Sequence, residues 1–105
     1  MKSERLTKLF EFLEDEPENP FNLYAIGVEY LNHDSLKSLN YFEKVLAEHP
    51  DYLPVYYQAA LLYVELENDD KAEETFLKGV KLAQNKGEQL TERELKSAYD
   101  EFKFE

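Results

Sequence analysis

The feature that most constrains the fold of this chain is an apolar pattern that occurs twice, at an interval of 33 to 34 residues. In the first copy, four residues spaced i, i+3, i+4 and i+7 share one helical face: Leu23, Ile26, Gly27 and Tyr30. In the second copy, this spacing is held by Tyr56, Ala59, Ala60 and Tyr63. A helix with one apolar face cannot bury that face alone, so each copy must pack against a partner.

A second amphipathic stretch follows each pattern and supplies that partner. Ser38 and Phe42 of the first copy recur as Ala72 and Phe76 in the second. A polar turn separates the two stretches of each copy, and Pro50 ends the first copy. The sequence therefore predicts two helical hairpins, and a residue without a side chain at Gly27 allows the second helix to approach closely there.

A period near 34 residues made of a helix–turn–helix unit is typical of the tetratricopeptide repeat (TPR), and the chain resembles this family from about residue 20 to 83. The family pattern W-x2-L-G-x2-Y…A-x3-F…P is matched by both copies. The departures are mild. Leu23 and Tyr56 replace Trp, Ala59 and Ala60 replace Leu-Gly, Ser38 replaces Ala, and Gln84 stands where a closing Pro belongs. The resemblance implies an all-α fold, a right-handed α-solenoid of antiparallel helical hairpins with about six helices.

The length of 105 residues fits a single domain, 1–105. We expect four parts: an N-terminal flanking helix in 1–17, a first repeat over 20–50, a second repeat over 51–86 and a C-terminal capping helix in 88–105. Cap residues predict the starts of six helices, over 4–15, 20–31, 35–49, 52–66, 69–85 and 92–103. The caps that we expect are Ser3, Asn19, Asp34 or Ser35, Asp51, Asn68 and a Thr91–Glu94 capping box, with Gly87 as a C-terminal stop.

The formal net charge of −11 excludes some classes of partner. The acidic excess is spread along the chain and would repel phosphate backbones and anionic lipid, so we expect neither nucleic-acid nor membrane binding. A basic partner is favoured weakly, because salt screens exposed charges. There is no cysteine, no signal-peptide pattern and no long apolar run, so we expect a cytoplasmic protein without disulfides.

The first helix of each copy carries a second apolar stripe, beside the one that packs within the hairpin. In the TPR family these helices line a concave face that holds peptides, so the resemblance implies a binding groove. The groove residues that it implies are Phe21, Tyr24, Val28, Leu31, Tyr57, Leu61 and Val64, with Asn32, Gln58 and Glu65 as polar neighbours. Tyr24 and Tyr57 are the expected anchors, because a tyrosine ring offers a large contact area at little cost in side-chain entropy.

Two alternatives to a partner groove stay open for this stripe. It could be a homo-oligomerisation surface that forms a homodimer, or it could be core that the terminal helices cover. Catalysis is not expected, because the chain has no nucleophile elbow, phosphate loop or clustered His, Asp and Ser set. His33 and His49 lack the converging ligands that a metal needs, so we expect no catalytic residue, metal or cofactor.

Some TPR domains bind the carboxylate at the C-terminus of chaperones through cationic side chains on the groove helices. Here the matching positions hold Tyr24 and Val28, and no Lys or Arg occurs from Asn19 to Leu36. We therefore predict no binding of an EEVD-type peptide, because its carboxylates would meet aromatic and acidic groups. Fluorescence anisotropy with such a peptide measures this, and micromolar affinity would contradict the prediction.

Overall fold

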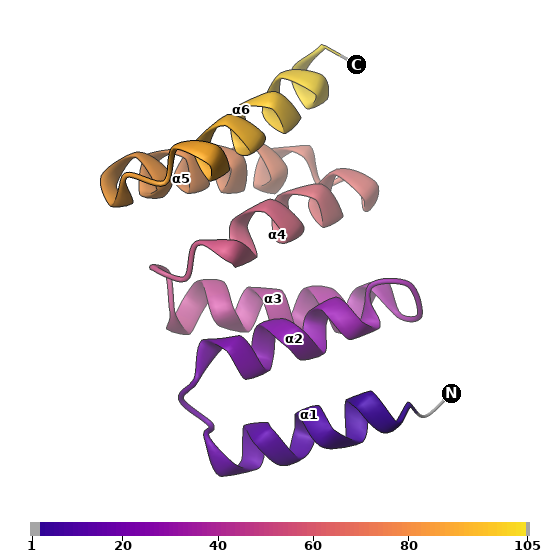
Figure 1. Ribbon diagram of the computed structural model, residues 1–105. Coiled ribbons are helices and arrows are strands. Elements are labelled where there is room, and N and C mark those ends of the chain that lie inside the picture. Colours follow the sequence, from indigo (N-terminus) through magenta and orange to yellow (C-terminus); the bar gives the residue numbers. More distant parts are fainter. Residues whose placement is uncertain (1–2, 105) are drawn as a thin grey trace. The chain divides into compact units, whose positions relative to one another are not determined.

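The computed structural model describes residues 3–104, and all their regular structure is helical (Figure 1). Six helices occur in this part of the chain: α1 (Glu4–Asp15), α2 (Pro20–Tyr30), α3 (Ser35–Glu48), α4 (Pro54–Glu65), α5 (Asp69–Lys86) and α6 (Gln89–Lys103). The chain divides into two compact units, Met1–Tyr52 with α1 to α3 and Leu53–Glu105 with α4 to α6. The predicted all-α class with about six helices is confirmed. The prediction of a single domain stays a prediction.

The first unit is built on a tight hairpin of α2 and α3. Gly27 of α2 faces the ring of Phe42 of α3 so closely that a Cβ added at Gly27 would lie 2.6 Å from the Phe42 Cε1 atom. The hydroxyl of Ser38 donates a buried hydrogen bond of 2.6 Å to the Gly27 carbonyl oxygen. Both Phe42 and Ser38 are fully buried. The expected close approach at Gly27 is therefore confirmed, and it sets the distance between the two helices.

Helix α1 packs on α2 from the other side of the unit. Leu9 is the buried residue of its apolar face. The buried side chain of Asn22 donates hydrogen bonds of 3.1 and 3.2 Å to the carbonyl oxygens of Phe12 and Glu16 at the end of α1. Carbonyl groups at a helix C-terminus need partners from outside the helix, so Asn22 helps to satisfy them and fixes the end of α1 against α2.

The second unit repeats the hairpin with α4 and α5 and adds α6 against α5. Gly79 of α5 is the point of closest approach: a Cβ there would lie 2.8 Å from the Tyr56 Cβ atom of α4 and 3.1 Å from the Leu95 Cδ1 atom of α6. Leu95 is fully buried, and the Phe76 ring of α5 contacts the Tyr99 ring of α6 at 5.8 Å between centroids. One residue without a side chain thus lets α5 pack closely against both neighbours.

Four of the predicted helix starts are confirmed. The side chains of Ser3, Asn19, Asp34 and Asn68 each accept a hydrogen bond from a backbone N–H in the first turn of their helix. Gly87 ends α5 in the left-handed conformation at φ 72°, as expected of a glycine stop.

The predicted starts of the fourth and sixth helices are wrong. Asp51 is not a cap, because the Tyr52 N–H donates to the His49 carbonyl oxygen in a turn and α4 begins only at Pro54. The Thr91–Glu94 capping box does not form either. After Gly87 the Glu88 N–H donates to the Ala83 carbonyl oxygen, which turns the chain at once, and α6 begins at Gln89.

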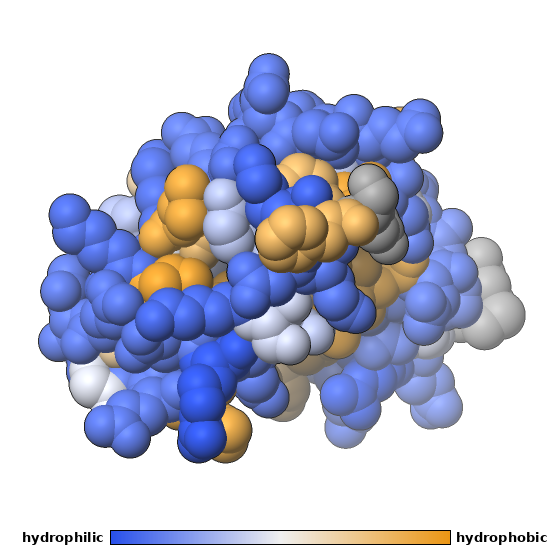
Figure 2. Space-filling view, turned by 90° about the horizontal axis from the view of Figure 1, so that it is seen from above, coloured by the Kyte–Doolittle hydropathy of each residue, from blue (hydrophilic) through white to orange (hydrophobic). Residues whose placement is uncertain are grey.

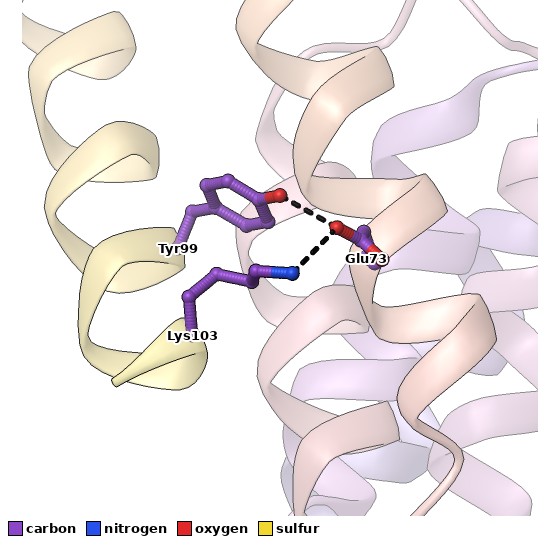
Figure 3. A network of polar contacts seen from close by, with 3 residues as sticks. All are labelled: Glu73, Tyr99 and Lys103. Carbon is purple, nitrogen blue, oxygen red and sulfur yellow. Dashed lines mark hydrogen bonds and ion pairs between the residues drawn. The ribbon is translucent and has the colours of Figure 1, made fainter. Parts of the chain in front are cut away.

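A small polar network joins α6 to α5 (Figure 3). The Tyr99 hydroxyl donates a hydrogen bond of 2.6 Å to the Glu73 Oε2 atom, and the Lys103 Nζ atom lies 3.2 Å from the same oxygen. The Tyr99 hydroxyl and then Lys103 lower the pKa of Glu73, and the bond to Glu73 raises the pKa of Tyr99. The network therefore favours the ionised form of Glu73 in the folded second unit.

We predict that Gly27→Ala destabilises the protein. Helix propensity alone would make this change stabilising by up to about 1 kcal/mol. The added methyl group would overlap the buried Phe42 ring, so we expect the free energy of unfolding to fall by about 1–3 kcal/mol in denaturant titrations. Gly27→Ala should cost less in a Phe42→Leu background, where the overlapping Cε1 and Cζ atoms of the ring are absent. An unchanged or increased stability of the single variant would contradict the close contact.

We predict that Glu73→Gln makes the free energy of unfolding less dependent on pH in the acid range. The folded pKa of Glu73 is lowered, so its stabilising contribution is present above the ordinary value of 4.5 and is lost as the pH falls through the folded pKa. Wild type should be more stable than the variant near neutral pH, and this difference should shrink below pH 4.5, as measured by denaturant titration. Glu74→Gln is the control, since Glu74 pairs with Lys78 on its own helix. A difference that is constant with pH would exclude the network.

Candidate partner-binding surface

The first of two exposed apolar stripes lies on α2. Its members recur at helical spacing along one face of the helix. Phe21 is 54% exposed and Val28 is 36% exposed, whereas Tyr24 and Leu31 are half-buried. Asn32 is exposed in the turn that follows α2. The opposite face of the same helix holds the buried residues Leu23 and Ile26, so α2 is apolar on two sides and covered on one.

The second stripe lies on α4 at the equivalent positions. Tyr57 is 36% exposed and Leu61 is 38% exposed, and Val64 is half-buried. Of the predicted polar neighbours, Gln58 is half-buried and Glu65, the last residue of the helix, is exposed. The buried side of α4 holds Tyr56, Ala59, Ala60 and Tyr63. The exposed stripes are defined here as two sets of residues: Phe21, Tyr24 and Val28 of α2 with Leu31 directly after it, and Tyr57, Leu61 and Val64 of α4.

The two expected anchor tyrosines differ in their surroundings. The Tyr24 ring contacts Phe42 at 5.9 Å and Tyr52 at 5.6 Å between ring centroids, so much of it is used within the first unit. Tyr57 is the more exposed ring. Neither ring is fully buried, and full burial of both is the condition under which the groove hypothesis would fail.

Helix α6 brings residues next to Tyr57 that the sequence pattern did not indicate. A pocket of about 420 Å³ lies between α4 and α6 in the second unit, and it is lined by Tyr57, Arg93, Glu94, Ser97, Ala98 and Glu101. Sequence reasoning assigned α6 only a capping role. The signal that could have revealed a second role is the polar stripe of Glu94, Ser97 and Glu101, which recurs at i, i+3 and i+7 beside the apolar face. We call this pocket the α4–α6 pocket.

A second hollow, of about 440 Å³, lies in the first unit between α1 and the turn that joins α2 to α3. Its lining includes Ser3, Tyr30, His33, Asp34 and Lys37. Most of these side chains already have structural roles. Ser3 and Asp34 accept helix-capping hydrogen bonds, and the Lys37 ammonium lies 5.4 Å from the Tyr30 ring centroid. His33 lies in the turn between α2 and α3, and we assign no ligand to this hollow.

The part of the chain that the structure describes has neither a metal-binding cluster nor a membrane-spanning helix. Within residues 3–104, no three His, Asp or Glu side chains converge in a way that could hold a metal ion. None of the helices described is both long enough and apolar enough to cross a bilayer. Figure 2, which looks onto the α6 side of the second unit, shows a mostly hydrophilic face with apolar side chains in a few separate clusters.

Comparisons with known proteins agree with this architecture. The sequence profile of the tetratricopeptide repeat matches residues 33–91. The solution NMR structure of a tetratricopeptide repeat domain protein from Salinibacter ruber is 35% identical, with a TM-score of 0.77 over 83% of this chain and 89% of that one. A crystal structure of a tetratricopeptide repeat domain protein from the same organism is 34% identical, with a TM-score of 0.77 over 81% of this chain and 96% of that one. No curated protein sequence matches the chain.

These similarities cover more than half of the chain, and they agree with the helical hairpins described above. They confirm the predicted fold class, an all-α helical-repeat solenoid. Domains of this kind are generally non-catalytic modules that bind protein partners. The chain belongs to the tetratricopeptide repeat family.

Proposed function

We propose that this protein binds a segment of a partner protein through the exposed stripes of α2 and α4. The observation that carries the proposal is the matched exposure of equivalent residues in the two units. Val28 and Leu61 stand 33 residues apart in the repeat and are 36% and 38% exposed. Full burial of a large aliphatic side chain contributes about 1.5–3 kcal/mol, and covering the exposed third of Val28 and Leu61 would recover a corresponding fraction from each. Several such residues in one stripe therefore support a binding role.

The packing of the hairpins supports the same proposal. The buried faces of α2 and α4 supply most of the contacts that hold each hairpin together. Tyr24 also packs on Phe42, but Val28 and Leu61 remain more than a third exposed and are available to a partner. Their mixture of aromatic and branched aliphatic side chains suits an apolar or amphipathic segment. Asn32 and Glu65 lie at the ends of the stripes, where they could bond to the backbone of such a segment.

We predict that Val28→Ser/Leu61→Ser weakens binding of peptides selected on the wild-type protein from a displayed random library. Each change removes an aliphatic contact from an exposed stripe, so we expect the dissociation constant to rise about tenfold or more in calorimetric titration. The matched control is Leu36→Ser/Leu77→Ser, which removes two exposed leucines from α3 and α5, outside the stripes. Equal losses in both double variants would contradict the proposal.

The competing role, homo-oligomerisation through the same stripes, is separated by sedimentation velocity over a wide range of protein concentration. A partner-binding protein should sediment as a monomer throughout this range. A concentration-dependent dimer that Val28→Ser/Leu61→Ser abolishes, and that the control double variant retains, would instead assign the stripes to self-association.

A further inference from the structure

We infer that the α4–α6 pocket is a subsite for a cationic side chain of the partner segment, and that arginine fits it best. The inference rests on the proposed function, because it names the chemistry of one residue of the bound segment. It adds α6 to the binding surface, and it predicts a positively charged residue in the partner segment, which the apolar stripes do not specify. Three properties of the molecule support it: the shape of the pocket, its charges and the chemistry that these offer to a ligand.

The pocket is an open depression, so a long side chain can enter it from solvent. Its volume of about 420 Å³ lies at the lower end of the range for ligand pockets. The exposed Tyr57 ring of α4 forms one wall, and the small side chains of Ser97 and Ala98 lie in the lining contributed by α6. A flat group of the occupant would stack on the part of the Tyr57 ring that is exposed.

Two carboxylates of the lining are not paired within the described residues. Glu94 and Glu101 lie two turns apart on the same face of α6, with Ser97 and Ala98 between them. Neither side chain forms a hydrogen bond or ion pair with another described residue. By contrast, Glu92 of the same helix is paired: it lies 2.8 Å from the Lys96 ammonium and accepts a hydrogen bond from Gln84 of α5.

Arg93 is the cation among the described lining residues, and it offsets one of the two carboxylates. The lining is left with a net negative charge, in a chain whose formal net charge is −11. An acidic pocket on an acidic protein attracts cationic segments over a distance and disfavours anionic ones. Charge complementarity therefore points to a basic occupant.

The combination of a ring and two carboxylates favours arginine over lysine. A guanidinium group can stack on an aromatic face while its N–H groups donate to carboxylate oxygens in the plane of the group. A lysine ammonium is a more strongly hydrated point charge. It cannot stack flat on the ring while it donates hydrogen bonds to the carboxylates. Leu61, one turn from Tyr57 on α4, would then contact an apolar residue next to the arginine in the partner segment.

The test is NMR titration of the whole protein with N-acetyl-arginine methylamide, with the citrulline analogue as a neutral probe of nearly the same shape. We expect weak binding of the arginine probe, in the millimolar range, with shifts of the backbone amides of Tyr57, Ser97 and Ala98. The lysine analogue should bind less tightly, and the citrulline analogue should cause little shift. Equal binding of the arginine and citrulline probes would overturn the inference.

Three variants test the residues. Glu94→Gln/Glu101→Gln should weaken binding of the arginine probe about tenfold. Glu11→Gln/Glu14→Gln on α1, which changes the net charge equally, should leave this binding nearly unchanged. Arg93→Gln should strengthen it a few-fold, a gain that partial unfolding cannot produce. An arginine affinity that is the same in all three variants and the wild type would overturn the inference.

The results also separate this inference from the proposed function. If the library peptides that depend on Val28 and Leu61 carry no excess of arginine, and the arginine probe does not bind, the subsite is excluded and the stripes keep their role. If the arginine probe binds at Tyr57 but no peptide depends on Val28 and Leu61, the proposed function fails and the cation subsite stands.

Discussion

The structure of each unit depends on close contact between helices at positions that have no side chain. In the first unit the Phe42 ring fills the space beside Gly27, and in the second the Tyr56 side chain lies against Gly79. Protein interiors are packed so densely that a single added methyl group at such a point must displace its neighbours. The small residues therefore determine the distance between the two helices of each hairpin. This distance in turn determines which faces of the helices are covered.

This closure has a consequence for the surface. One face of α2 and one face of α4 are buried by the hairpin contacts, so some apolar residues on the other side of each helix are left partly exposed. Val28 and Leu61 remain exposed at equivalent places, although the units differ in the small residues that they use. Repetition of the same packing thus repeats the same exposed chemistry, which is how a duplicated hairpin can offer more than one contact to a partner.

The two sides of α6 differ in how their charged side chains are paired. The side toward α5 pairs its ionisable groups, with Lys103 and Tyr99 on Glu73 and Lys96 on Glu92. These pairs are partly exposed, so solvent and salt reduce what they contribute to stability. The side toward α4 keeps Glu94 and Glu101 without a partner in the described residues, beside an exposed tyrosine ring. One helix thereby both completes the packing of the second unit and supplies charge to the α4–α6 pocket.

Local sequence determined most of the secondary structure and the composition of the exposed stripes. Helical periodicity and capping side chains act within a few residues, so the sequence alone predicts α1, α2, α3 and α5 with their caps, and the repeat spacing identifies the residues of the stripes. The starts of α4 and α6 are not predicted correctly from local side chains. Backbone hydrogen bonds from Tyr52 and Glu88 to the preceding turns override the capping signals there. The roles of Asn22, Gly79 and Glu101 depend on which helices meet, and only the tertiary structure decides this, because residues distant in sequence become neighbours only when the helices pack.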